Sequence, residues 1–296
     1  MGEKVLMKGN EAIGEAAIRS GCRHFFGYPI TPQTELSAYM AKKMPKINGV
    51  FLQAESEVSA INMVYGAAAA GMRAMTSSSS PGISLKAEGI SYLAAGDLPC
   101  VIVNIVRGGP GLGGIQPAQS DYFQAVKGGG HGDYHLIVLA PNSVQELAHL
   151  TAEAFNISDE YRIPTMILGD GTLGQMMEPV DLDAIPEPIY ADKPWAARGT
   201  DNKRKKNVVE TLYLEASELE KKVLEREEKY NVVKENLQRY EAHDIDDADI
   251  IISSYGITSR VVETAVKSLR EEGIKVGVIR PITLWPFPEK IFKTVK

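Results

Sequence analysis

The 296-residue sequence contains little cysteine, no excess of positive charge and no long apolar run. Its two cysteines, Cys22 and Cys100, cannot by themselves hold an iron–sulfur cluster or a structural zinc, because such sites take about four ligands. The formal net charge of −6 argues against a nucleic-acid partner. No apolar run approaches the roughly 20 residues of a membrane-spanning helix, and the N-terminus shows no signal-peptide core. We therefore expect a cytoplasmic protein with buried, unpaired cysteines and no membrane partner.

Residues 1–190 alternate short apolar runs with helix-like segments. This alternation predicts an α/β fold in which helices cover both faces of a parallel sheet. The run "VIVNIV" at 101–106 is apolar at nearly every position, as expected of a strand buried on both faces. The expected strands are 23–28, 49–54, 73–78, 99–106, 135–140 and 164–170, and the expected helices are 11–21, 34–44, 57–71, 83–97 and 143–161.

The remainder of the chain changes character twice. Residues 179–206 are rich in proline and then in basic residues, which predicts a strap leaving the first domain. Residues 207–241 combine dense charge with an apolar residue every three or four positions, which predicts one long amphipathic helix, either a surface helix or an inter-subunit one. A strand, a helix and a second strand then predict a βαβ unit in a second domain that is small or cut short. The predicted divisions are 1–180, 181–245 and 246–296.

Polar side chains follow the first two expected strands, at the sheet edge where parallel folds bind ligands. In "GYPITP", Thr31 lies between Pro29 and Pro32, which predicts an N-cap with proline at the first helical position. Such a helix start also attracts anions. Glu57 opens the next helix, with Ser56 as its cap. It is either an acidic residue favoured by the helix dipole or a partly desolvated carboxylate suited to proton transfer.

Arg107 ends the most apolar strand, and a glycine-rich loop follows it. The arginine either extends to solvent or binds an anion. The loop, Gly108 to Gly114, has five glycines and one proline in seven residues, so its backbone could approach an anion closely. It has neither the Walker A pattern nor the G-x-G-x-x-G spacing. His131 is a weaker candidate for a general base.

These segments together resemble a known family. The stretch "GYPITPQTEL", then "QAESEVSAINMVYG", "MTSSSSPGISLKAEG" and "IVRGGPGLGG" in that order, resembles the α subunit of the 2-oxoacid:ferredoxin oxidoreductases. The loop with "QSDY" looks most like the branched-chain, 2-oxoisovalerate (3-methyl-2-oxobutanoate) members. The resemblance implies a thiamine-dependent, pyrimidine-binding-like domain at 1–180. It also implies the start of a transketolase C-terminal-like domain at 246–296, truncated at its end.

The resemblance also implies cofactors and partners. Thiamine diphosphate would be shared with a β subunit that holds the diphosphate and Mg²⁺, so no metal is expected on this chain. Iron–sulfur clusters would lie in partner subunits, which include a γ subunit and a ferredoxin-like δ subunit. Ferredoxin would accept the electrons and coenzyme A the acyl group. The implied cofactor-binding residues are Pro29, Ile30, Glu57 and Ser79, with Glu57 also catalytic, and the implied substrate carboxylate ligands are Thr31 and Arg107.

The function expected from this resemblance is oxidative decarboxylation of a branched-chain 2-oxoacid to acyl-CoA and CO₂. No lysine or arginine occurs from Gly108 to Val126, and Leu112 and Ile115 would face the substrate instead. A second substrate carboxylate would need a cation, so apolar 2-oxoacids are favoured. Two alternatives stay open: the same chemistry on 2-oxoglutarate or pyruvate, and a non-enzymatic nucleotide-binding subunit that uses the glycine loop.

Overall fold

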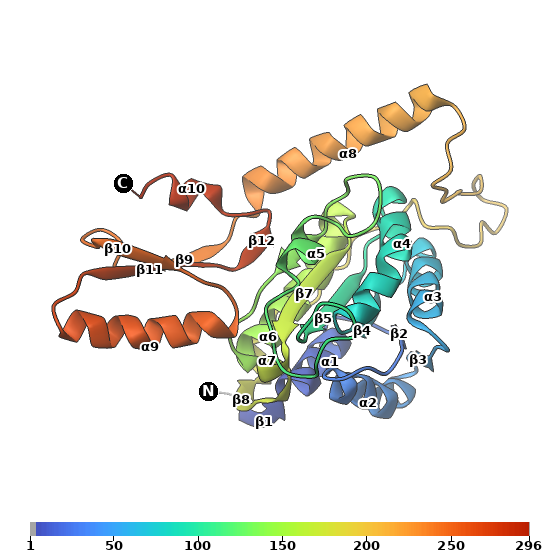
Figure 1. Ribbon diagram of the computed structural model, residues 1–296. Helices are drawn as coiled ribbons and strands as arrows, with labels where there is room; N and C mark the ends of the chain where they lie inside the picture. The colour runs from blue at the N-terminus through green and yellow to red at the C-terminus, as the bar shows by residue number, and fades with distance from the viewer. Residues whose placement is uncertain (1–3, 296) are drawn as a thin grey trace.

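The computed structural model describes residues 4–295, and its centre is a seven-stranded sheet (Figure 1). The strand order is β12-β6-β7-β5-β4-β2-β3, and every neighbouring pair is parallel except β12 with β6. This confirms the predicted α/β class. The strands are β2 (His24–Gly27), β3 (Val50–Gln53), β4 (Ala74–Ser78), β5 (Val101–Val106), β6 (Ile137–Leu139), β7 (Thr165–Asp170) and β12 (Thr283–Trp285).

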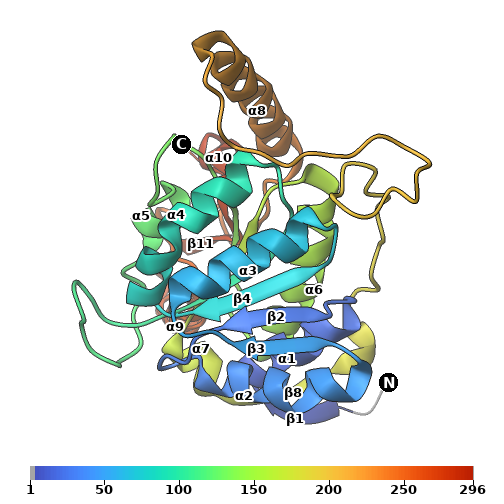
Figure 2. The same ribbon diagram turned by 90° about the vertical axis from the view of Figure 1, so that its right-hand side faces the viewer.

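Helices cover both faces of this sheet (Figure 2). α3 and α4 pack together on one face, and α1 packs against α2 and α6 on the other. All six residues of β5 are buried, as the apolar run predicts, and both cysteines are buried and free. The helices are α1 (Gly9–Arg19), α2 (Thr34–Lys43), α3 (Glu57–Ala69), α4 (Pro81–Ala95), α5 (Tyr122–Val126), α6 (Val144–Tyr161) and α7 (Gly171–Gln175), with 3₁₀ turns η1 (Met44–Ile47) and η2 (Leu182–Ala184).

Two smaller sheets complete the fold. β1 (Lys4–Lys8) pairs antiparallel with β8 (Met177–Asp181), so the start of the predicted strap is a strand. The second unit has the order β10-β11-β9, and β10 and β11 are parallel with α9 (Ile257–Glu271) between them, which confirms the predicted βαβ unit. After it the chain returns to the main sheet as β12, which the sequence did not predict, and then forms α10 (Glu289–Phe292). The remaining strands are β9 (Tyr240–His243), β10 (Ile250–Ser253) and β11 (Val276–Pro281).

The predicted helix over 207–241 is shorter than expected, because α8 spans only Ala216–Asn236. The segment before it is extended: Val208, Leu212 and Leu214 are exposed, whereas Val209 packs on the main core. Its β-branched and aromatic residues favour this extended form. After α8, Tyr240 begins β9 instead of continuing the helix. Only Tyr230 and Val233 of α8 are buried, so it is a surface helix along the top of the molecule in Figure 1.

None of the helices within residues 4–295 is long and apolar enough to cross a membrane.

Candidate functional site

Glu57 lies at the sheet edge where the parallel strands end, in the first turn of α3. Ser56 caps the helix as predicted, since its hydroxyl accepts a hydrogen bond from the Ser59 N–H at 3.2 Å. Glu57 is only 6% exposed. Its carboxylate lies against the first turn of α4, because a Cβ atom placed on Gly82 would be 2.8 Å from Glu57 Oε1. Within the described part of the chain, this carboxylate accepts no hydrogen bond. It is therefore desolvated and available to a ligand.

Lys86 lies one helical turn beyond Gly82 and is fully buried. Its ammonium donates hydrogen bonds to Thr76 Oγ1 and to the Ser77 carbonyl, both at 2.9 Å. Burial lowers the pKa of Lys86 to about 7, and the nearby charge of Glu57 acts in the opposite direction. Lys86 is not among the site residues that the sequence predicts.

A run of small hydroxyl residues at the end of β4 forms the floor of the site. Ser77 donates to Gln33 Oε1 at 2.6 Å, and Gln33 in turn donates to the Tyr28 carbonyl at 3.2 Å. The hydroxyls of Ser78 and Ser79 are buried and have no hydrogen-bond partner among residues 4–295. Buried polar groups normally have partners, so these two free hydroxyls indicate a place for a polar ligand, and Ser78 lies against Gly82 together with Glu57.

Ser80 links this floor to Arg107. Its N–H donates to Asn104 Oδ1 at 3.0 Å, and its hydroxyl oxygen accepts from the Arg107 N–H at 3.0 Å. These bonds hold Ser80 at a φ of 29°, which residues other than glycine rarely adopt. Asn104 also donates to Asp121 Oδ2 at 3.1 Å. The polar Asn104 inside the otherwise apolar "VIVNIV" is the sequence signal for this link.

Arg107 is buried and does not extend to solvent. Its guanidinium donates to the Thr31 carbonyl at 3.1 Å and to the Leu112 carbonyl at 3.0 Å, while Nε has no partner in the described chain. The structure thus brings Thr31, Arg107 and the glycine loop together. Through Ser80 and Gly82, this group is continuous with Glu57.

The predicted N-cap at Thr31 is wrong. α2 begins at Thr34, and its cap position is Gln33, which makes no side-chain capping bond. Residues 31–33 form a turn instead, closed by a bond from the Gln33 N–H to the Ile30 carbonyl at 3.1 Å. Thr31 is exposed, and the Arg107 guanidinium binds its carbonyl, not its hydroxyl. Of the other predicted cofactor residues, Pro29 is exposed and Ile30 half-buried in this same turn.

The glycine loop stands out from the surface. Leu112 is 82% and Ile115 63% exposed. A side chain on Gly113 would meet the Gly108 carbonyl oxygen at 1.8 Å, so the loop closes on itself only with glycine there. Two cavities flank the loop, one of about 330 Å³ bounded by Ser80 and Asp121 and one of about 380 Å³ bounded by Thr31 and Ile115. Ile115 lines the second of these cavities, whereas Leu112 lines neither.

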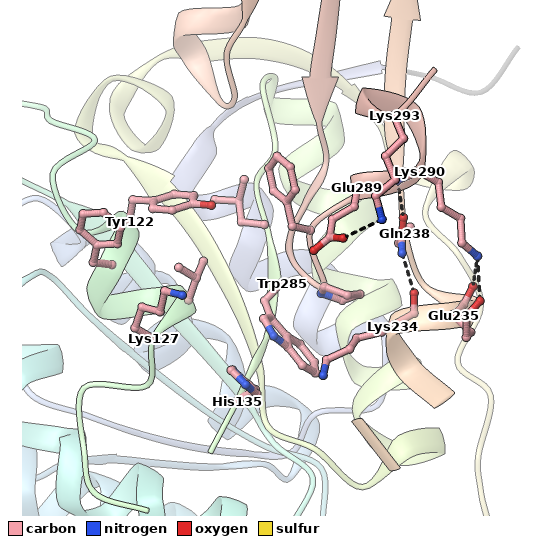
Figure 3. Close-up of a pocket in the computed structure, with 15 residues that line it drawn as sticks. Tyr122, Lys127, His135, Lys234, Glu235, Gln238, Trp285, Glu289, Lys290 and Lys293 are labelled. Carbon is pink, nitrogen blue, oxygen red and sulfur yellow. Dashed lines mark hydrogen bonds and ion pairs between the residues drawn. The ribbon is translucent and has the colours of Figure 1, made fainter. Parts of the chain in front are cut away.

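A larger cavity of about 550 Å³ lies elsewhere, between α5, the end of α8 and α10 (Figure 3). Trp285 stacks on His135 at 4.6 Å in its wall. Two of its lysines are paired with acidic neighbours: Lys290 with Glu235 at 2.9 Å, and Lys293, at the end of α10, with Glu289 at 3.2 Å. None of the predicted site residues lines it, so its size alone does not make it the reaction site. No group of three or more histidine, cysteine, aspartate or glutamate residues within 4–295 is arranged to hold a metal ion.

Comparison with known proteins identifies the family. The model "Pyruvate flavodoxin/ferredoxin oxidoreductase, thiamine diP-bdg" matches residues 15–256, and "Pyruvate:ferredoxin oxidoreductase core domain II" matches residues 248–296. The ketoisovalerate oxidoreductase subunit VorB of Methanothermobacter marburgensis is 52% identical over 96% of this chain and 81% of its own length. The 2-oxoglutarate synthase subunit KorA of Methanocaldococcus jannaschii is 37% identical over 98% of this chain and 85% of its own.

A solved structure agrees with these sequence matches. It is the 2-oxoglutarate:ferredoxin oxidoreductase of Magnetococcus marinus with 2-oxoglutarate, coenzyme A and succinyl-CoA bound. It superposes with a TM-score of 0.89 at 31% identity, over 99% of this chain and 56% of that chain. The chain therefore belongs to the 2-oxoacid:ferredoxin oxidoreductase family and is of the α-subunit type.

Proposed function

We propose that this chain is the α subunit of a thiamine diphosphate-dependent complex that oxidatively decarboxylates a branched-chain 2-oxoacid to acyl-CoA and CO₂, with ferredoxin as electron acceptor. The observation that carries the proposal is the buried, hydrogen-bond-free carboxylate of Glu57 against Gly82, continuous with Arg107 and Thr31 along one sheet edge. The partners are a β subunit that holds the diphosphate and Mg²⁺, a γ subunit and a ferredoxin-like δ subunit with iron–sulfur clusters.

The residues present fit the pyrimidine half of thiamine diphosphate. Glu57 offers a carboxylate for a ring nitrogen, and the free hydroxyls of Ser78 and Ser79 offer further hydrogen bonds. Gly82 has no side chain, so a planar ring can approach Glu57 closely. When bound, the cofactor supplies the carbon nucleophile for the keto group of the substrate. Glu57 holds or releases the proton at its carboxyl oxygen that this activation needs.

The substrate carboxylate fits Arg107. Its Nε–H is buried and has no partner within residues 4–295, and two of its other donors bind backbone carbonyls that a carboxylate can replace. For the substrate side chain, Ile115 lines the cavity beside Thr31, and no cation occurs between Gly108 and Val126. The greater identity to the ketoisovalerate subunit than to the 2-oxoglutarate subunit supports an apolar substrate.

The proposal is tested with Glu57→Gln in the complex reconstituted with its partner subunits. Hydrogen exchange at C2 of the cofactor should slow by about two orders of magnitude, in line with typical acid–base contributions, while cofactor binding changes less. Glu55→Gln is the matched control, because Glu55 is exposed and accepts a hydrogen bond from the Ser59 hydroxyl at 2.6 Å. An unchanged exchange rate in Glu57→Gln would show that Glu57 merely starts a helix.

Substrate choice is tested separately by comparing kcat/KM for 2-oxoisovalerate, pyruvate and 2-oxoglutarate. We expect 2-oxoisovalerate to be preferred, since each buried methylene adds up to about 1 kcal/mol of discrimination. A higher value for 2-oxoglutarate contradicts the substrate assignment but not the reaction class. A purified complex that contains a nucleotide and no thiamine diphosphate would favour the non-enzymatic alternative.

A further inference from the structure

Gln119 is a polar residue just beyond the glycine loop, and the proposed reaction assigns it no role. Both polar atoms of its side chain bind the start of α9, in the second unit of the chain. Nε2 donates to the Tyr255 carbonyl at 2.8 Å, and Oε1 accepts from the Thr258 hydroxyl at 2.6 Å. The Gln119 carbonyl oxygen accepts a third bond, from the Tyr255 hydroxyl at 3.2 Å. Three hydrogen bonds therefore join Gln119 to a segment that begins 136 residues later in the chain.

The segment that binds Gln119 is itself fixed. Gly256 is the cap residue of α9, at a φ of 60°, and its carbonyl accepts a bond from the Ser259 hydroxyl at 2.8 Å. A Cβ placed on Gly256 would lie 2.8 Å from Gln119 Nε2, so the amide comes this close only because glycine is there. The Tyr255 ring packs on the ring of Tyr122, with centroids 5.9 Å apart. The start of α9 is thus a preformed binding site for the Gln119 amide.

The glycine loop has few other anchors. Residues 108–118 contain one polar side chain, Gln116, so the loop has almost no side chains with which to fix itself. It is closed at its base by the bridge between Arg107 and Pro117. Gln119 follows Pro117 by two residues and ties this end of the loop to α9. Segments with few contacts open easily, so the bonds of Gln119 restrict where the loop can lie.

The residues on either side of Gln119 form walls of both cavities beside the loop. Pro117, two residues before it, lines the cavity that includes Thr31. Ser120 and Asp121, the two residues after it, line the other cavity. A shift of the backbone at Gln119 would therefore move a wall of each cavity.

We propose that Gln119 is a positioning residue for the 2-oxoacid: it binds the start of α9 and so holds the glycine loop beside Arg107 and Thr31, where the substrate carboxylate binds. Gln119 acts through the loop and takes no part in the chemical step. A loop that is ordered before the substrate arrives costs less to bring against it, so the anchor lowers KM and has little effect on kcat. This inference rests on the proposed function, which places the substrate carboxylate at Arg107.

The first experiment measures steady-state kinetics with 2-oxoisovalerate on the reconstituted complex. Gln119→Leu keeps the approximate size of the side chain and removes both of its bonds to α9. We expect KM to rise about tenfold, as the loss of two hydrogen bonds of ordinary strength implies, and kcat to change by less than about threefold. Thr258→Val removes one of these bonds from the side of α9 and should raise KM about threefold.

Arg260→Met is the matched control. Arg260 lies on α9, two residues beyond Thr258, and also joins the second unit to the rest of the chain, since it donates to Glu178 Oε1 at 2.7 Å. Within the described chain it makes no hydrogen bond to residues 108–121. If Gln119 only docks the second unit, Gln119→Leu and Arg260→Met should change KM alike, and that result overturns the proposal. A fall of kcat in Gln119→Leu at unchanged KM overturns it as well.

The second experiment needs no turnover. The N–H groups of Gly108 and Gly114 form hydrogen bonds within the loop, both at 2.9 Å, and their hydrogen–deuterium exchange reports its order. In the substrate-free complex, this exchange should be at least about tenfold faster in Gln119→Leu than in Arg260→Met. Equal exchange in the two variants would show that Gln119 does not hold the loop.

Failure of the proposed function looks different from failure of this inference. In that case the wild-type complex would not decarboxylate 2-oxoisovalerate. Amide exchange in 108–118 would still separate Gln119→Leu from Arg260→Met, and that difference would support the coupling of the loop to α9.

Discussion

At Gly82, the addition of a single methyl group should slow catalysis while leaving the free energy of unfolding almost unchanged. In Gly82→Ala the new Cβ would lie 2.1 Å from Ser78 Oγ and 2.8 Å from Glu57 Oε1, whereas ordinary contacts of this kind begin near 3.4 Å. Ser78 can rotate, because its hydroxyl has no partner in the described chain. Glu57 can only move away from α4, since its backbone is fixed by the Ser56 cap. The methyl group therefore displaces the carboxylate by several tenths of an ångström.

The expected magnitude follows from two opposing effects. Alanine in a helix is favoured over glycine by about 0.5–1 kcal/mol, which offsets part of the steric penalty, so the free energy of unfolding should change little. Displacement of a catalytic group by about 1 Å can cost 100-fold, so cofactor C2 exchange should fall by about 10- to 100-fold. The matched control is Gly66→Ala on α3, where nothing lies within 4 Å of the new Cβ. If thermal melts and exchange rates are the same for both variants, Glu57 does not depend on the close approach at Gly82.

Three further variants test the buried charges. Asp159→Asn leaves Arg73 and Lys193 buried without their carboxylate and should lower the free energy of unfolding in urea by about 3–5 kcal/mol, whereas the exposed neighbour variant Glu160→Gln should have almost no effect. Arg280→Met removes two hydrogen bonds to Glu146, at 2.8 and 2.7 Å, and one to Glu241. In this variant a protease should cut within 240–281 before it cuts the rest of the chain. Equal cleavage inside and outside 240–281 would contradict this. In Lys86→Met the free energy of unfolding should rise less steeply with pH than it does in the wild type. Between pH 7 and 10.5 the unfolded lysine holds a proton that folded Lys86 has lost, so stability rises with pH in the wild type by up to about 1.4 kcal/mol per pH unit. Parallel curves for the two proteins from pH 7.5 to 9.5 would refute that assignment.

The parts of the fold that could be predicted are those in which local pattern decides the outcome. The strand at 101–106 is apolar at nearly every position because helices cover it on both sides, and the structure buries all six residues. Two features of the fold could not be predicted from the local sequence, because tertiary contacts determine them. The three-residue strand β12 exists only through its pairing with β6, about 145 residues away in the chain. The segment before α8 is extended because Val209 packs on the main core, although its charge pattern resembles that of the helix that follows.

In the candidate site, too, local sequence predicts some residues, whereas tertiary contacts determine others. The helix start at Glu57 and its Ser56 cap could be predicted, because both lie in one short stretch whose geometry is local. Arg107 was predicted to be important, but its partners are backbone carbonyls of Thr31 and Leu112, which no side-chain pattern reveals. The burial of Lys86 was not predicted, because a lysine in a helix usually indicates a solvent-exposed face. Its neighbours Ile83 and Ile90, three before and four after it, were the available sign that this face is apolar.

The chemistry of the end of β4 explains why four separate elements meet at this edge. Five consecutive small hydroxyl residues, 76–80, leave room for larger polar side chains to approach the strand, and each occupied hydroxyl has a different partner. Thr76 accepts from Lys86 on α4, Ser77 donates to Gln33 before α2, and Ser80 binds the backbone of Arg107 after β5. The two hydroxyls left free, Ser78 and Ser79, come between these anchored positions, and Ser78 lies against Gly82 with Glu57. Since the anchored bonds already fix the surrounding elements, the free hydroxyls and the Glu57 carboxylate are the groups that remain for a ligand to satisfy.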